Sequence, residues 1–366
     1  MSYRFLRSFN DSASNLRGKI VGIYSLLIAA NVAIWVWALI AFNEHPLLLG
    51  TVFLAYSLGL RHAVDADHIA AIDNVTRKLM QEGKRPVAVG FFFSLGHSTV
   101  VVLASIGVAA TAAVFNDQLE DFRTISGMIG TSVSAAFLLL IAAINIFILV
   151  NVYNTFQRVK QGGSYVAEDL DVLLANGGFF ARLFRRLFRL VERSWHMYPL
   201  GFLFALGFDT ATEVGLLGIS AAGGSCGLPI WSILVYPALF TAGMALIDTT
   251  DSILMVGAYG WAFVKPVRKL YYNMTITFVS VIVAVIVGGI ETLGLIGARF
   301  SLKGALWDTV ASLNDQFGTL GYLIIAIFIV SWAISIAVYR FKGYDQIELR
   351  GRGTGSPVTA ICQVRD

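Results

Sequence analysis

Charged side chains are scarce in this chain, and their scarcity is the first guide to its class. Asp, Glu, Lys and Arg make up 14% of the 366 residues, whereas hydrophobic residues make up 57%. The mean hydropathy is +0.72. Soluble domains carry about 25% charged residues. The composition therefore excludes an ordinary soluble protein and predicts a polytopic integral membrane protein.

Several other features are missing, and each absence removes a class of protein. The two cysteines, Cys226 and Cys362, are far apart and form no C-x-x-C pair, so we assign them no disulfide or thiolate role. The nucleotide-binding pattern G-x-x-x-x-G-K-[ST] is absent, which argues against a nucleotide-driven motor. H-E-x-x-H is absent too, which removes a zinc protease. A metal sensor would need a soluble output domain, and the sequence indicates none.

Apolar stretches of about 20 residues recur along the whole chain, and each is long enough to cross a bilayer as a helix. The predicted spans are Ile20–Phe42, Leu47–Ile72, Val87–Val114, Ile125–Val152, Leu200–Ala222, Ile230–Tyr259, Thr275–Ile296 and Gly321–Tyr339. The predicted fold class is therefore all-α, a bundle of about eight transmembrane helices that forms a single domain over residues 1–366.

Basic residues collect in alternate loops, which by the positive-inside rule places both termini in the cytoplasm. The first span is too long for a signal peptide and reads as an uncleaved helix. The long cytoplasmic loop, about 153–197, carries arginines at helical spacing from Arg182 to Arg193. They predict an amphipathic helix on the anionic leaflet. The alternative is that these arginines only determine topology.

Ionisable residues concentrate in the segment RHAVDADHIAAIDN, Arg61 to Asn74, at the end of the second predicted span. Ionisable groups at membrane depth are expensive and usually functional. On a continuous helix, with roughly 100° per residue, His62, Asp65 and His68 fall on one face about 120° wide. This is metal-ligand spacing. Asp67 falls off that face, so it either turns to a neighbouring helix or becomes a ligand if the helix unwinds. The alternative is a structural role, in which one His and one Asp bridge helices by hydrogen bonds.

Three further spans carry polar groups at membrane depth, in the segments FFFSLGHSTVV, LGFDTATEVGLL and GMALIDTTDS. Their candidate metal ligands are His97, Asp209, Glu213, Asp248 and Asp251. Lipid offers such groups no partner, so they must face inward. Taken alone, His97 could be an interhelical hydrogen-bonder and the threonines could be packing residues. Gly96, Gly207 and Gly243, each beside a polar motif, would permit close helix approach or local unwinding.

Imidazole with carboxylate and no thiolate suits divalent Ni, Co, Zn, Mn or Fe, whereas Cu(I) calls for sulfur and Mg or Ca for mostly oxygen. At this point the motifs RHAVDADHI, FSLGHSTVV, LGFDTATE and G-M-x-x-x-D-T-x-D together resemble the signatures of the nickel/cobalt transporter (NiCoT) family. The resemblance implies an eight-helix inner-membrane permease of high affinity for Ni²⁺ or Co²⁺. Its metal-recognition motif would fall on His62, Asp67 and His68, with Asp65 in the same stretch.

The alternative function is a membrane-bound acyltransferase, because H-x4-D from His62 to Asp67 resembles a catalytic pair in which His is the general base. Its depth within a span, among other buried carboxylates, argues against that chemistry. A transporter needs no enzyme activity and no cofactor, since the metal is its substrate. We expect the bilayer as its surroundings and no nucleic-acid partner. The sequence leaves open the oligomeric state, the preference for nickel or cobalt, and whether membrane potential or ion coupling drives uptake.

Overall fold

The computed structural model describes residues 9–12, 14–43, 48–111, 116–160, 191–206, 211–225, 227–262 and 266–341. All regular elements in these ranges are helices. They are α2 (Leu16–Ala41), α3 (Leu49–His62), α4 (Ala66–Gln81), α5 (Val89–Thr111), α6 (Asn116–Lys160), the 3₁₀ turn η3 (Ser194–His196), α9 (Met197–Ala205), α10 (Ala211–Ser225), α11 (Ile230–Ile233), α12 (Val235–Ala262), α13 (Pro266–Arg299), α14 (Ala305–Asp315) and α15 (Phe317–Phe341).

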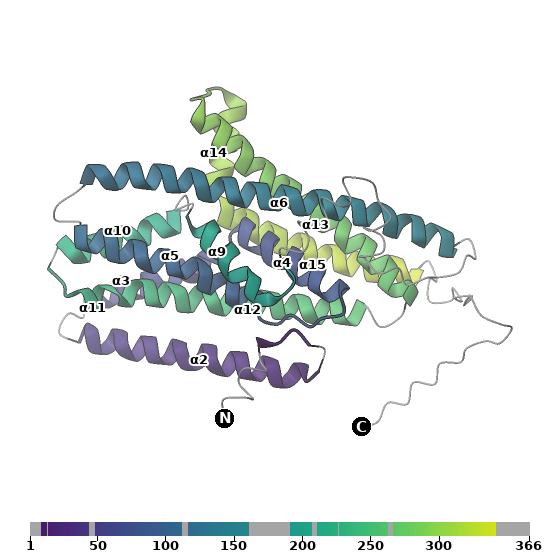
Figure 1. Cartoon of the computed structure of the whole chain (residues 1–366), viewed down its shortest axis with the longest axis horizontal. Helices are drawn as coiled ribbons and strands as arrows, with labels where there is room; N and C mark the ends of the chain where they lie inside the picture. The colour runs from purple at the N-terminus through teal and green to yellow at the C-terminus, as the bar shows by residue number, and fades with distance from the viewer. Residues whose placement is uncertain are drawn as a thin grey trace.

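The prediction of an all-α membrane bundle is confirmed. Five helices in the described part of the chain are long and apolar enough to cross a membrane, and the pair α14 and α15, bent by 79°, passes the same test together. The exact count of eight spans stays a prediction. The long helices run roughly side by side, with α2 at one side of the bundle and α6 at the other (Figure 1).

The second predicted span is not one continuous helix, and that expectation was wrong. α3 ends at His62 and α4 begins at Ala66, with Asp65 in an extended conformation before the first turn of α4. Turn hydrogen bonds, from Val64 N to Arg61 O and from Asp65 N to His62 O, satisfy the backbone at this break. Irregular backbone is tolerated at membrane depth when protein buries it. The shared helix face calculated for a continuous helix therefore does not exist.

Helices α6, α13 and α15 bury the break. The apolar residues around it are Val64, Ala66, Ile69 and Ala70, together with Leu138 of α6, Val279, Val283 and Val287 of α13, and Ile324 of α15. Gly321 shows how close α15 comes, since a Cβ atom on it would lie 1.5 Å from the carbonyl oxygen of Val64. The break is thus held from behind by tight packing, which leaves its other side to face α5 and α12.

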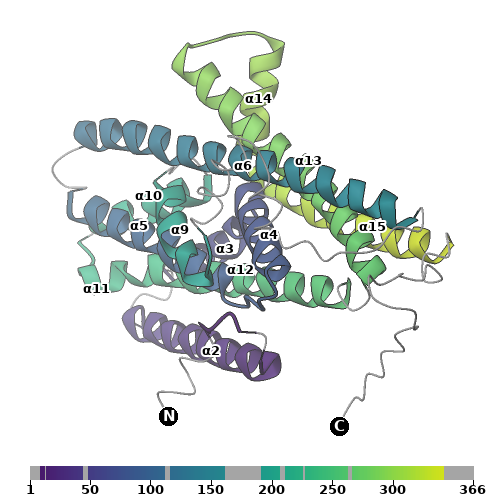
Figure 2. The ribbon, with the colours of Figure 1, turned by 45° about the vertical axis from the view of Figure 1, so that its right-hand side comes forward.

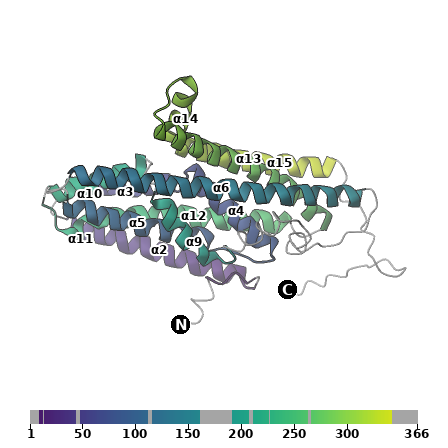
Figure 3. The same ribbon diagram turned by 45° about the horizontal axis from the view of Figure 1, so that its top comes forward.

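Two regions expected as loops are helical. α6 begins at Asn116 and continues to Lys160, beyond both ends of the predicted span, and α14 occupies most of the predicted loop between Arg299 and Asp315. Figures 2 and 3 show α14 projecting from the body of the bundle where α13 turns back into α15. Most of the predicted amphipathic helix, apart from Val191 to Arg193, lies outside the described residues.

Close helix approach is present at two of the expected glycines, Gly96 and Gly243, and also at Gly90, which was not expected; Gly207 lies outside the described residues. A Cβ atom on Gly96 would lie 1.9 Å from the carbonyl oxygen of Tyr198, which belongs to α9. A Cβ atom on Gly90 would lie 1.9 Å from the carbonyl oxygen of Asp248, on α12. Only glycine permits such approach. α5 is therefore clamped between two helices, and its His97 is fixed relative to both.

Candidate metal centre

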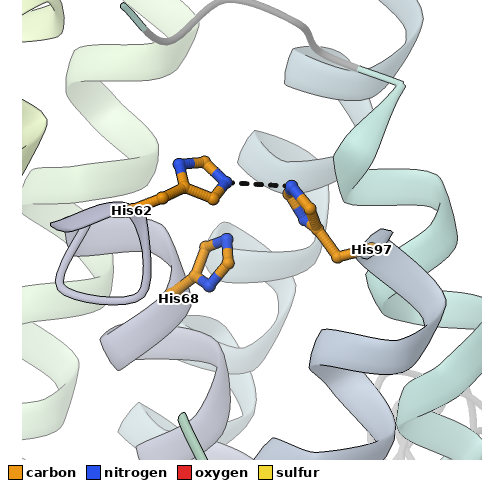
Figure 4. Close-up of side chains that lie close together, drawn as sticks. All are labelled: His62, His68 and His97. Atoms are coloured by element: carbon orange, nitrogen blue, oxygen red, sulfur yellow. Dashed lines mark hydrogen bonds between the residues drawn. The ribbon is translucent and has the colours of Figure 1, made fainter. Parts of the chain in front are cut away.

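Three buried histidines meet at the centre of the bundle. His62 is the last residue of α3, His68 lies in the first turn of α4, and His97 lies in the middle of α5. Their exposed fractions are 1%, 0% and 3%. One nitrogen from each ring lies within 4.8 Å of the others, and the rings converge as shown in Figure 4. The break between α3 and α4 makes this possible, because it lets His62 and His68 point to one centre.

Two histidines and a carboxylate are in direct contact within the cluster. His62 Nε2 lies 2.9 Å from His97 Nε2, and His97 Nε2 lies 2.9 Å from Glu213 Oε1. The same Glu213 oxygen is 3.8 Å from His62 Nε2. Glu213 comes from the first turn of α10 and is 2% exposed. Two imidazole nitrogens and a carboxylate oxygen thus converge on a small buried volume, a ligand set suited to a divalent transition metal.

In two of the histidines, the second ring nitrogen, Nδ1, contacts a carboxylate. His62 Nδ1 lies 2.9 Å from Asp65 Oδ2 and 3.1 Å from Thr212 Oγ1. His68 Nδ1 lies 3.3 Å from Asp248 Oδ2. Aromatic walls close the site, with Phe240 against His62 and Phe93 against His68 at ring-centroid distances of 5.4 and 4.8 Å. The imidazoles are therefore enclosed by apolar rings and by their own hydrogen-bond partners.

The structure places the remaining predicted ligands in different positions. Asp67 is partly buried in the first turn of α4, outside the group of three histidines. Asp251 lies one turn beyond Asp248 on α12, and its Oδ2 atom is buried. Asp209 lies outside the described residues. Of the predicted set, the structure thus brings His62, His68, His97 and Glu213 together, with Asp65 and Asp248 behind two of the rings.

A second buried polar network surrounds Asp73 and Arg77, farther along α4. Asp73 accepts hydrogen bonds from Tyr259 and, at 2.8 Å, from Ser280 Oγ. Arg77, 1% exposed, donates to Thr277 Oγ1 and to Asn74 Oδ1, both at 2.9 Å. Asp73 is itself fully buried. This network joins α4 to α12 through Tyr259 and to α13 through Thr277 and Ser280.

Sequence reasoning missed the partners of that network. Asn145 of α6 donates to Asn74 Oδ1 at 2.7 Å, and both side chains are buried. An asparagine inside an apolar span was the available signal, since an amide in the bilayer core needs a partner. Thr277 and Ser280 gave no signal, because hydroxyl residues in membrane helices commonly bond to their own backbone.

A helical membrane protein that buries imidazoles and carboxylates at its centre has the construction of a metal-ion permease. Comparison with known proteins gives the family. Residues 48–338 match the family described as high-affinity nickel-transport protein. The chain belongs to this family, and it is a transporter rather than an enzyme.

Individual relatives agree with this assignment. The chain is 64% identical over 340 residues to a high-affinity nickel transport protein of Cupriavidus necator, covering 93% of this chain and 97% of that protein. It is 50% identical to the hydrogenase nickel incorporation protein HupN of Bradyrhizobium diazoefficiens, over 91% of this chain and 87% of the relative. It is 40% identical to the cobalt transport protein NhlF of Rhodococcus rhodochrous, over 88% of this chain and 92% of the relative. No solved structure matches the chain. The comparisons give the acyltransferase alternative no support.

Proposed function

We propose that this protein takes up Ni²⁺, Co²⁺ or both with high affinity across the bacterial cytoplasmic membrane, with both termini in the cytoplasm. The observation that carries the proposal is the group of three buried histidines whose nitrogens lie within 4.8 Å of one another. The names of the relatives, which mention nickel and cobalt, support these two metals. The metal is the substrate, and the proposal needs neither a cofactor nor a nucleotide.

The proposed ligands are the imidazole nitrogens of His62, His68 and His97, with Glu213 Oε1 as a fourth. Borderline metals such as nickel and cobalt prefer imidazole, whereas magnesium and calcium prefer an all-oxygen site. Glu213 supplies charge beside His97 and reduces the net charge of a bound dication from two to one. A site of this kind selects transition metals over the more abundant hard cations by ligand type.

Two of the remaining predicted residues, Asp67 and Asp251, we assign to the path of the ion rather than to the central site, whereas Asp209 lies outside the described residues. Carboxylates along such a path would attract a cation without the strong nitrogen ligation that holds it at the centre. Broken helices of this kind form the midplane sites of transporters that work by alternating access. Hydration stabilises the ion in water, so ligands along the path must replace its bound water molecules one after another.

Membrane potential supplies enough energy for accumulation. A charge moving through 100 mV gains about 2.3 kcal/mol, so a dication gains about 4.6 kcal/mol, equivalent to a gradient of roughly three decades. Proton coupling stays open, since histidine must lose its proton to bind metal and could regain one on release. Neither source of energy would require a nucleotide motor.

Competitive uptake of labelled Ni²⁺ and Co²⁺ by cells that express the chain tests the proposal. We expect uptake above the empty-vector rate, and loss of uptake in His62→Ala and His68→Ala at unchanged membrane content. Removal of a polar residue from a membrane helix makes insertion easier, so a loss of uptake would not reflect failed insertion. His196→Ala is the matched control, because His196 lies in η3, outside the group of three histidines. Uptake at the empty-vector rate by the wild type would refute the proposal.

A further inference from the structure

The two ring nitrogens of His68 have different surroundings. Nδ1 faces the Asp248 carboxylate, at 3.3 Å from Oδ2 and 3.5 Å from Oδ1. Nε2 is buried and has no hydrogen-bond partner among the residues that the structure describes. A carboxylate can only accept, so a hydrogen bond at Nδ1 requires the proton to be there. The neutral ring then carries its lone pair on Nε2, which is the nitrogen free to bind a metal.

A serine stands behind that carboxylate. Ser94 Oγ lies 2.8 Å from Asp248 Oδ2 and 2.7 Å from the carbonyl oxygen of Gly90. Ser94, Asp248 and His68 are each 0% exposed, and they come from α5, α12 and α4. The hydroxyl has one hydrogen to donate, and a hydrogen bond to an ionised carboxylate is roughly twice as strong as one to a neutral carbonyl. Ser94 therefore donates preferentially to Asp248.

His62 is held in a similar way, whereas His97 is not. At His62, the contacts of Nδ1 with Asp65 and Thr212 leave Nε2 toward the cluster. At His97, Nε2 faces the cluster and the buried Nδ1 has no hydrogen-bond partner in the described part of the chain. Two of the three imidazoles are thus fixed from behind by a carboxylate and a hydroxyl. Such partners fix the tautomer and the ring orientation of metal-binding histidines.

We propose that Ser94, acting through Asp248, is a positioning residue that holds His68 with Nε2 directed to the metal. The described hydrogen bonds of Ser94 go to Gly90 and Asp248 rather than to His68, so its effect passes through the carboxylate. With Ser94 removed, Asp248 Oδ2 loses a donor and the carboxylate can rotate away from Nδ1, since the distance of 3.3 Å is already long for a hydrogen bond. The inference rests on the proposed metal site and adds Ser94 to it.

The test measures Ni²⁺ affinity and the His68 tautomer separately, on purified full-length protein. Loss of an outer partner typically weakens metal binding about 10- to 100-fold. We expect Ser94→Ala to weaken Ni²⁺ binding about 10-fold and Asp248→Asn to weaken it about 100-fold. Ser94→Thr, which keeps the hydroxyl, should bind Ni²⁺ about as tightly as the wild type does. Nitrogen-15 NMR of metal-free, histidine-labelled protein should show the Nδ1–H tautomer of His68 in the wild type and a mixture in Ser94→Ala. His68→Gln assigns the signal.

Ser105→Ala provides the matched control, because Ser105 is a fully buried serine on the same helix whose hydroxyl has no described hydrogen-bond partner. It should change neither readout. A Ser94→Ala protein with wild-type affinity, or with weaker affinity and an unchanged tautomer, would overturn the positioning role. Failure of the metal site would look different: His62→Ala would then bind Ni²⁺ as tightly as the wild type, while the metal-free NMR result would still decide the effect of Ser94 on His68.

Discussion

His97 gives the sharpest test of the metal centre, because two roles for it predict different results. As a ligand, it binds the metal through Nε2. As an interhelical hydrogen-bonder, it only joins α5 to its neighbours through the 2.9 Å contacts with His62 and Glu213. Replacement by alanine should remove metal binding in the first case and stability of the metal-free protein in the second.

The expected magnitude follows from mass action. A ligand that binds only the folded state, at about 100 times its dissociation constant, stabilises the protein by about 2.7 kcal/mol. If His97→Ala weakens binding about 100-fold, the upper end of what loss of an outer partner costs, the same metal concentration stabilises the variant by only about 0.4 kcal/mol. Nearly all of the metal-dependent stabilisation should therefore disappear.

Thermal unfolding of purified protein in detergent, with Ni²⁺ and with Mg²⁺, measures this difference. His97→Gln keeps a donor for Glu213 but is a poor metal ligand, so it should restore metal-free stability without restoring the effect of Ni²⁺. His196→Ala should retain the full effect. A His97→Ala protein that Ni²⁺ stabilises as much as the wild type would refute the ligand role and leave His97 a structural residue.

Two further substitutions test the packing that positions the site. Gly90→Ala should lower uptake and stability, because its Cβ would lie 1.9 Å from the Asp248 carbonyl oxygen and force α5 away from α12. Gly107→Ala on the same helix should lower neither, because its Cβ would have no other atom within 4 Å. Equal uptake by the two variants would show that the close approach is dispensable. Arg77→Met should lower the free energy of unfolding by about 3 kcal/mol, because it removes two hydrogen bonds of a buried guanidinium, to Thr277 and to Asn74, each worth about 1.5–3 kcal/mol. Chemical denaturation measures this cost, and a loss below about 1 kcal/mol would contradict it.

The sequence by itself determined the class of the protein and the neighbourhood of its site. Composition and apolar runs were sufficient for the class, because the bilayer requires long apolar helices whatever their packing. The rarity of ionisable residues at membrane depth singled out a set of histidines and carboxylates that includes His62, His68 and His97. That argument needs only the cost of burying such groups, so it holds without knowledge of how the helices are arranged.

Sequence periodicity failed where the helix is not regular. The face shared by His62, Asp65 and His68 assumed a continuous helix, whereas the chain breaks after His62 and turns Asp65 back onto it. The break is held by distant residues, such as Gly321 of α15, whose backbone packs against Val64. No local pattern reports a contact made more than 250 residues along the chain.

Tertiary structure alone decided where each carboxylate lies within the candidate site. Asp65, Asp248 and Glu213 are all carboxylates at membrane depth, and the sequence predicted all three as metal ligands. Of these three, only Glu213 reaches the histidine nitrogens that face each other. The other two contact Nδ1 atoms from behind. Whether a carboxylate faces the metal or the back of a ring depends on how helices cross, and packing of glycines and apolar side chains from the whole chain sets that crossing.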